Sequence, residues 1–109
     1  MSRKKGNEAE ELACAYLQDN GYSIVERNFY SRFGEIDIIA FREDVYHFVE
    51  VKSGEDYEKA IQNITPQKLS RIVKTVHVYM KKHALENAFM LDALIVTPAS
   101  IDIVQNITL

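Results

Sequence analysis

The sequence contains a single cysteine, Cys14, so it cannot form a disulfide bond within the chain. It also lacks a cluster of cysteine and histidine residues at the spacing of a zinc site. No apolar run is long enough to cross a bilayer, and the N-terminus lacks the apolar core of a signal peptide. These absences argue against a disulfide-stapled secreted domain, a zinc module and a membrane-spanning helix, and they predict a cytoplasmic protein.

An excess of positive charge is also missing. The chain carries 13 Lys and Arg residues against 16 Asp and Glu residues, which gives a net charge of −3. This balance argues mildly against strong non-specific nucleic-acid binding, which relies on summed positive charge. The basic residues are unevenly spread, however, with clusters at residues 3–5 and 81–83. The sequence is therefore compatible with a locally basic face on an acidic protein.

What is present is typical of one globular domain. Hydrophobic residues make up 47% of the chain and charged residues 27%, the ordinary balance of such a domain. A chain of 109 residues can bury one modest core, and it shows no repeats, low-complexity segments or linkers. We therefore expect a single domain over residues 1–109, with residues 1–6 as a flexible basic tail.

The apolar periodicity predicts an α/β fold. Helical spacing and capping residues predict helices over residues 7–20, 58–63 and 66–85, the middle one short. Apolar runs bounded by turn residues predict strands over residues 22–29, 36–41, 45–51, 89–97 and 101–107. The main elements follow the order α-β-β-β-α-β-β, which predicts a mixed β-sheet flanked by helices.

Asp92 interrupts the apolar run of residues 89–97. That run suits a strand buried on both faces, and a carboxylate in such a place needs a polar partner. We expect Asp92 to lie at the edge of the strand and to pair with a basic residue such as Arg71.

The most informative stretch is residues 34–52. Two apolar runs, residues 36–41 and 45–51, are separated by Glu43 and Asp44, and this pattern predicts a β-hairpin. Neither of the two acids is favoured in the tightest hairpin turns, so a two-residue loop and a four-residue loop both remain open.

Any loop centred on those two acids sets the register of the hairpin. Asp37 then lies opposite Glu50, and Glu35 lies opposite Lys52. Two carboxylates that face each other across a β-ladder repel and destabilise the sheet unless something compensates their charge. A divalent cation bound by both would do so, and Lys52 lies on the same strand face as Glu50.

An Asp, a Glu and a Lys on one sheet face suit metal-assisted phosphodiester hydrolysis. Asp37 and Glu50 offer the hard oxygen ligands that Mg²⁺ or Mn²⁺ prefers. The metal would polarise the phosphate and generate hydroxide, while Lys52 would stabilise charge or orient the attacking water. The alternative is that these charges mark the solvent face of a half-exposed strand.

Residues outside the hairpin could complete such a site. Glu10 lies on the flank of the first helix's apolar stripe, where it is either a solvated acid or a third carboxylate for the metal. Arg32 lies in the turn before the hairpin, and Lys68 and Arg71 lie in the first turns of the long helix. These three basic residues could contact a phosphate or could be ordinary surface residues.

Several segments of the chain resemble one known family. They are residues 10–17 (EELACAYL), 21–22 (GY), 27–28 (RN), 32–37 (RFGEID) and 48–52 (FVEVK). Together they closely resemble the YraN-type family of small bacterial proteins with a restriction-endonuclease-like fold, which is similar to archaeal-type Holliday junction resolvases. The resemblance covers nearly the whole chain, and the GEID and FVEVK segments at this separation are its most specific part.

The resemblance implies a single restriction-endonuclease-like domain. It implies that Asp37, Glu50 and Lys52 form the D…ExK nuclease signature and that Glu10 is the helical carboxylate that accompanies it. Some positions depart from the family pattern: Ala9 stands where Gly is usual, Tyr30 where a basic residue is common, and Ser53-Gly54 where Thr-Arg is typical. Two basic residues are thereby lost near the site, which weakens the expected affinity for a phosphate backbone.

Two functions of different classes follow. The first is a Mg²⁺- or Mn²⁺-dependent endonuclease-like protein that acts on structured or branched DNA. The second is a catalytically silent module on the same fold that binds nucleic acid or a protein partner. A homodimer remains open in both, because two sites can then address two strands. A third hypothesis is a structural protein whose charged hairpin forms a dimer face.

Overall fold

The computed structural model describes the backbone of residues 2–107 and the side chains of residues 8–107. The elements follow the order α1 (Ser2–Asp19), β1 (Ser23–Ser31), β2 (Gly34–Arg42), β3 (Val45–Ser53), α2 (Tyr57–Gln62), α3 (Pro66–Lys82), β4 (Ala88–Val96) and β5 (Ile101–Val104). The predicted order of main elements and the mixed α/β architecture are confirmed. Helix α1 begins before residue 7, where the sequence predicted its start, and the flexible tail expected at residues 1–6 stays a prediction. No helix within residues 2–107 is long and apolar enough to span a membrane.

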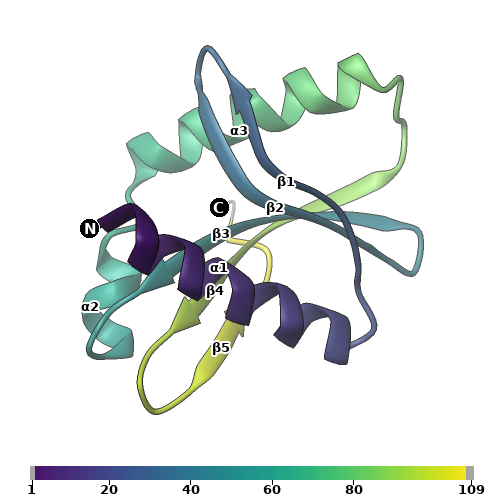
Figure 1. The fold of residues 1–109 in the computed structure, drawn as a ribbon. Helices are drawn as coiled ribbons and strands as arrows, with labels where there is room; N and C mark the ends of the chain where they lie inside the picture. The colour runs from purple at the N-terminus through teal and green to yellow at the C-terminus, as the bar shows by residue number, and fades with distance from the viewer. Residues whose placement is uncertain (1, 108–109) are drawn as a thin grey trace.

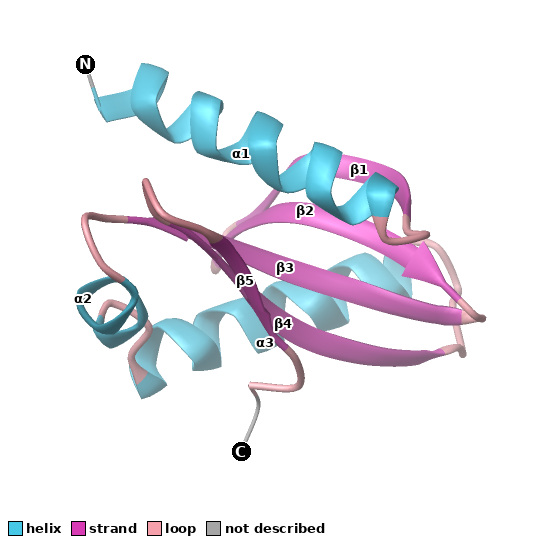
Figure 2. Cartoon of the chain, turned by 90° about the horizontal axis from the view of Figure 1, so that it is seen from below, coloured by secondary structure: helices cyan, strands magenta, loops and turns pink. Residues whose placement is uncertain are grey.

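The five strands form one sheet in the order β1-β2-β3-β4-β5. Strands β3 and β4 are parallel and are joined by the crossover through α2 and α3, whereas the other neighbouring pairs are antiparallel. Figure 2 shows α1 on one side of the sheet and α3 on the other. The strands alternate apolar side chains between two covered faces, so the molecule has three layers.

Each face of the sheet has its own apolar core. Helix α1 packs on one face through a cluster that includes Ala13, Leu17, Ile38, Val49 and Leu94. Helix α3 packs on the opposite face through a cluster that includes Ile72, Val76, Tyr79, Phe29, Ile36, Ile39, Phe48 and Leu91. Helix α2 extends that second face by packing Ala60 near Ala93 and Ile95.

The β2–β3 hairpin closes through a two-residue turn. Arg42 pairs with Val45, and both residues between them, Glu43 and Asp44, have positive φ angles of 53° and 65°. Two left-handed residues in succession are characteristic of the type I′ turn, whose twist matches that of the strands. Asn87 Nδ2 donates to Asp44 Oδ1 over 3.0 Å and so holds this turn against the start of β4. The shorter of the two loops left open by the sequence is the correct one.

Asp92 has a different partner from the one expected. Its Oδ2 lies 2.7 Å from His47 Nδ1, and its Oδ1 accepts from the backbone N–H of Asn106 over 2.9 Å. It is fully buried, so the prediction of an edge position is wrong. The predicted pairing with Arg71 is also wrong, because the pair lies on the α1 side of the sheet, where His47 packs edge-on against Tyr22.

We predict that Asp92→Ala lowers the free energy of unfolding by about 3 kcal/mol, because it leaves His47 and a backbone N–H without their buried acceptor. Equilibrium unfolding in urea measures this change. The matched control is Asp102→Ala, which removes an exposed carboxylate bonded to Ser100 Oγ and should cost less than about 1 kcal/mol. Equal losses in the two variants would contradict the assigned role of the buried pair.

Candidate metal and nucleic-acid site

The β1–β2 ribbon changes face in the middle of its length. Arg27 and Ile38 are paired and both face α1, as the ion pair of Arg27 with α1 and the packing of Ile38 show. Two residues farther along, the paired Phe29 and Ile36 face α3. Asn28 lies between and has a φ of 54°, a left-handed conformation that Asn tolerates better than most residues. Beyond this point the ribbon leaves the plane of the sheet and approaches α3 (Figure 1).

Strands β2 and β3 separate at the same place. Their backbone pairs keep the predicted register, but the last one is Ile38 with Val49. The expected pairings of Asp37 with Glu50 and of Glu35 with Lys52 therefore do not form. Instead the side chain of Asp37 crosses the gap, and its Oδ2 accepts from the backbone N–H of Val51 over 2.8 Å. A carboxylate thus replaces a ladder hydrogen bond at the point where the two strands diverge.

Asp37 and Glu50 nevertheless bring their carboxyl groups together. Asp37 is only 9% exposed. This burial, followed by a hydrogen bond and charge repulsion from Glu50, raises the pKa of Asp37 to about 8. The N–H of Val51 and the positive charge of Lys52 act in the opposite direction. The buried Asp37 and the half-buried Glu50 therefore bring two carboxyl groups together, which disfavours the ionised form of Asp37 unless a cation compensates the charge. Lys52 lies within electrostatic reach.

This donor set fits a magnesium-like ion. Mg²⁺ is typically bound through one or two carboxylates, while waters and substrate phosphates complete its octahedral shell. Among the side chains of residues 8–107, no three Asp, Glu, His or Cys residues gather closely enough to hold a metal ion. The arrangement of Asp37 and Glu50 therefore suits a partly hydrated cation that takes further ligands from a substrate, and does not suit a cage made wholly of protein ligands.

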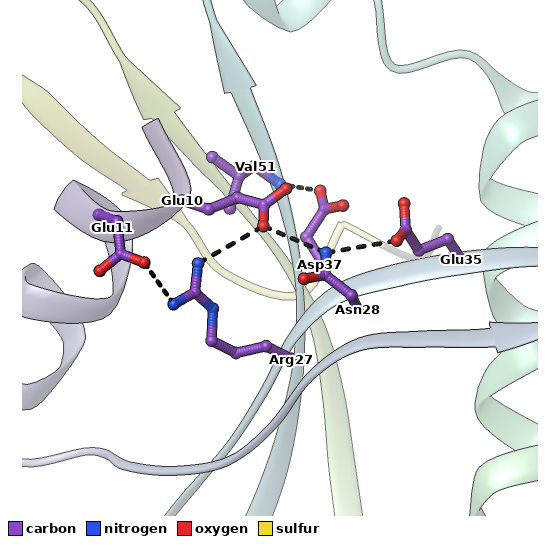
Figure 3. A network of polar contacts seen from close by, with 7 residues as sticks. All are labelled: Glu10, Glu11, Arg27, Asn28, Glu35, Asp37 and Val51. Carbon is purple, nitrogen blue, oxygen red and sulfur yellow. Dashed lines mark hydrogen bonds and ion pairs between the residues drawn. The ribbon is translucent and has the colours of Figure 1, made fainter. Parts of the chain in front are cut away.

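Glu10 is held beside this pair by a separate polar network, shown in Figure 3. Its Oε1 lies 3.6 Å from Arg27 Nη2 and accepts from Asn28 Nδ2 over 3.1 Å. Asn28 also donates to Glu35 over 3.3 Å, and Arg27 pairs with Glu11 over 2.6 Å. The network turns Glu10 toward the sheet, but it does not place Glu10 within one metal cluster with Asp37. Its role as a metal ligand stays a prediction.

Arg27 and Asn28 belong to the segments that resemble the family, but the sequence alone indicates no role for either residue. A signal was present: Asn is disfavoured inside strands, and residues 23–31 otherwise read as one strand. Such a residue in mid-strand often marks a backbone irregularity, and here its left-handed conformation aims an amide at two carboxylates. Arg27 then neutralises part of the negative charge that α1 brings to the site.

The predicted phosphate-binding residues lie away from the carboxylate pair. Arg32 and Lys68 are exposed, in the β1–β2 turn and the first turn of α3, respectively. Arg71 is also exposed, and its Cβ lies 3.9 Å from the position that a Cβ would take at Gly34. Gly34 precedes Asp37 by three residues, which is about 10 Å along an extended strand. Whether these residues bind a phosphate stays a prediction.

Comparison with known sequences identifies the family. The family model described as "Uncharacterised protein family UPF0102" matches residues 9–105, which include every predicted site residue. The chain belongs to UPF0102. A UPF0102 protein of Sulfurimonas denitrificans is 62% identical over 109 residues, all of both chains. One of Wolinella succinogenes is 53% identical over the same span, again all of both chains, and one of Helicobacter hepaticus is 48% identical over 99% of this chain and 97% of its own. The predicted YraN-type membership is confirmed.

The burial of Asp37 beside Glu50 predicts an unusual pH dependence of stability for this UPF0102 protein. An unfolded Asp releases its proton near pH 4, whereas folded Asp37 keeps it up to about pH 8. The folded state therefore binds more protons between these values, and stability is lost as the pH rises through that window. Asp37→Asn cannot ionise and still offers an oxygen to Val51.

We accordingly expect Asp37→Asn to be more stable than the wild type by about 2 kcal/mol or more near pH 9 in EDTA, and to match it near pH 4. Urea unfolding at both pH values measures the difference, with the exposed Glu55→Gln as control. Added Mg²⁺ should stabilise the wild type near pH 9 but not the variant. A variant that is less stable than the wild type near pH 9 would overturn the proposed carboxylate crowding.

Proposed function

We propose that this UPF0102 protein is a divalent-metal-dependent nuclease that hydrolyses phosphodiester bonds in structured or branched DNA. The observation that carries the proposal is the buried Asp37 against the half-buried Glu50, with Lys52 nearby, at the place where β2 and β3 separate. A protein keeps repelling carboxylates together at a cost in stability. That cost is understandable if the pair binds Mg²⁺ or Mn²⁺.

Each residue has a distinct role in this proposal. Asp37 and Glu50 hold the metal, and the Val51 N–H fixes the orientation of the Asp37 carboxylate. When bound, the metal supplies Lewis acidity to the phosphate and a low pKa to its water. Lys52 holds the attacking water or stabilises the charge that develops on the phosphate. Glu10, anchored by Arg27 and Asn28, would assist as an additional carboxylate near the metal site.

The architecture supports the same proposal. The candidate residues come from two adjacent antiparallel strands and from the helix that covers one face of a mixed sheet. This is the placement that the resemblance to restriction-endonuclease-like proteins implies for the D…ExK signature and its helical carboxylate. Fold resemblance alone does not establish chemistry, so the proposal depends on the geometry and charge of the carboxylate pair.

A catalytically silent nucleic-acid-binding or protein-interaction module is the second candidate. One observation favours it: within residues 8–107, Glu10 does not join Asp37 and Glu50 in one metal cluster. The negative net charge and the departures at residues 30 and 53–54 point the same way. In this candidate the carboxylate pair would be a structural remnant, and binding would not depend on a divalent metal.

Cleavage of labelled DNA distinguishes the two candidates. We expect the purified protein to cleave a four-way junction or a duplex with a single-stranded flap only when Mg²⁺ or Mn²⁺ is present. Asp37→Asn and Glu50→Gln should each lose at least about 100-fold in rate because the metal is no longer held, and Lys52→Met should lose about 10-fold to 100-fold.

The control is Glu58→Gln on the exposed side of α2, which removes a carboxylate outside the site and should leave the rate unchanged. Metal-dependent cleavage that persists in Asp37→Asn would contradict the assigned site. If the wild type binds these DNAs but cleaves none of them, with either metal, the silent module is the better description.

A further inference from the structure

Positive charge is concentrated in one segment of this acidic chain. Residues 59–85 contain six of the 13 basic residues and none of the 16 acidic ones. Five of the six lie on α3, namely Lys68, Arg71, Lys74, Lys81 and Lys82. All five are exposed. The remainder of the chain is correspondingly more acidic, so charge is unevenly distributed along the chain although its net value is only −3.

The five basic residues of α3 share one side of the helix. At about 100° per residue they fall within an arc of about 140°, and a 17-residue helix is about 25 Å long. Within residues 8–107, none of the five forms an ion pair with an Asp or Glu side chain. We call this set (Lys68, Arg71, Lys74, Lys81 and Lys82) the cationic ridge.

The tip of the β1–β2 hairpin is fixed against this ridge. Ser31 Oγ lies 2.8 Å from Thr75 Oγ1, and the fully buried Thr75 donates to Arg71 O over 3.0 Å. Ser31 Oγ also accepts from the backbone N–H of Phe33 over 3.0 Å. These bonds hold the turn, and with it Arg32, beside the middle of α3.

Two of the cations crowd one aromatic ring at this junction. The guanidinium of Arg32 lies 4.8 Å from the centre of the Phe33 ring, and the ammonium of Lys74 lies 5.6 Å from it. Lys82 rests in the same way over Phe29, at 5.6 Å. Cation–π contacts stabilise each charge, but they do not remove the repulsion between like charges. An anion bound between Arg32 and Lys74 would offset this repulsion.

We propose that the cationic ridge and Arg32 bind the phosphate backbone of double-stranded DNA. A linear row of exposed cations without acidic partners is the electrostatic footprint of backbone binding. The Lys68 ammonium also donates to the backbone carbonyl of Asn63 over 2.9 Å. Proteins that grip single strands add aromatic rings on which the bases stack. The two rings beside the ridge, Phe33 and Phe29, instead carry the protein's own cations. This favours a duplex over a single strand.

Strand β2 connects the region beside the ridge to the candidate nuclease site. The side chain of Arg71 lies beside Gly34. Gly34 is three residues before Asp37, which is about 10 Å along β2. The inference takes from the proposed function only that the partner is DNA, and it does not depend on hydrolysis.

Binding in EDTA tests the ridge without any cleavage. The probe is a fluorescein-labelled duplex of about 20 base pairs, measured by anisotropy in about 0.1 M NaCl. Each lost phosphate contact lowers affinity about eightfold at this salt and lowers the salt slope by about 0.9. Arg71→Gln should therefore bind fivefold to tenfold more weakly, and Lys68→Gln/Arg71→Gln/Lys74→Gln more than about 100-fold more weakly.

The matched control is Lys59→Gln, which removes the same charge from an exposed position on α2, off the ridge, and should change affinity less than twofold. Circular dichroism verifies the fold of every variant. Equal affinities for the triple variant and the control would overturn the inference, as would tighter binding to a single strand of the same length or to phosphatidylserine vesicles. Ridge-dependent binding by a protein that never cleaves would support the ridge and refute the nuclease.

Discussion

The hydrogen bond from the Val51 N–H to the Asp37 carboxylate marks the point on which the candidate site depends. Here the β1–β2 ribbon turns out of the sheet, and the ladder between β2 and β3 ends at the pair of Ile38 and Val49, before it reaches Asp37. A buried N–H at the end of a ladder needs an acceptor, and a side-chain carboxylate supplies it. The consequence is that an acid is drawn into a buried position beside Glu50, where its pKa rises to about 8.

The surrounding elements keep this arrangement in place. Asn28 in its left-handed conformation lets the ribbon change face, and its amide joins Glu10 of α1 to Glu35 of β2. On the far side of the sheet, the Ser31–Thr75 bond fixes the end of the same ribbon to α3. The two helices thus hold opposite sides of one bent ribbon. The bend brings Glu10 and Glu35 together around Asn28 and holds the β1–β2 turn with Arg32 beside α3.

Much of this fold follows from local sequence patterns. The register of the β2–β3 hairpin was predictable because any loop centred on Glu43 and Asp44 gives the same pairing. The extent of α3 was predictable to within a few residues from the spacing of its apolar positions and from Thr65, whose side chain accepts from the Lys68 N–H. In both cases the determining residues are close neighbours in the chain, so periodicity and capping rules apply directly.

The features that the sequence did not predict depend on contacts between residues that are distant in the chain. His47 and Asp92 are separated by 45 positions, and nothing local distinguishes His47 from Arg71 as a partner. The ladder ends before Asp37 at the level where Asn28, in another strand, has a positive φ. The sequence correctly indicated that the two acids would meet, but it placed them in a regular ladder. Only the three-dimensional structure shows that Glu10 is bound by Arg27 and Asn28. Within residues 8–107, Glu10 does not form one metal cluster with Asp37 and Glu50.

The most direct test of the account is the location of a bound metal in crystals soaked with Mn²⁺ near pH 8. The account predicts one anomalous-scattering peak between Asp37 and Glu50, with an oxygen of each carboxylate about 2.1 Å from the ion and waters completing the shell. A soaked crystal with no peak there, or with its only peak beside Glu10 and Glu35, would contradict it.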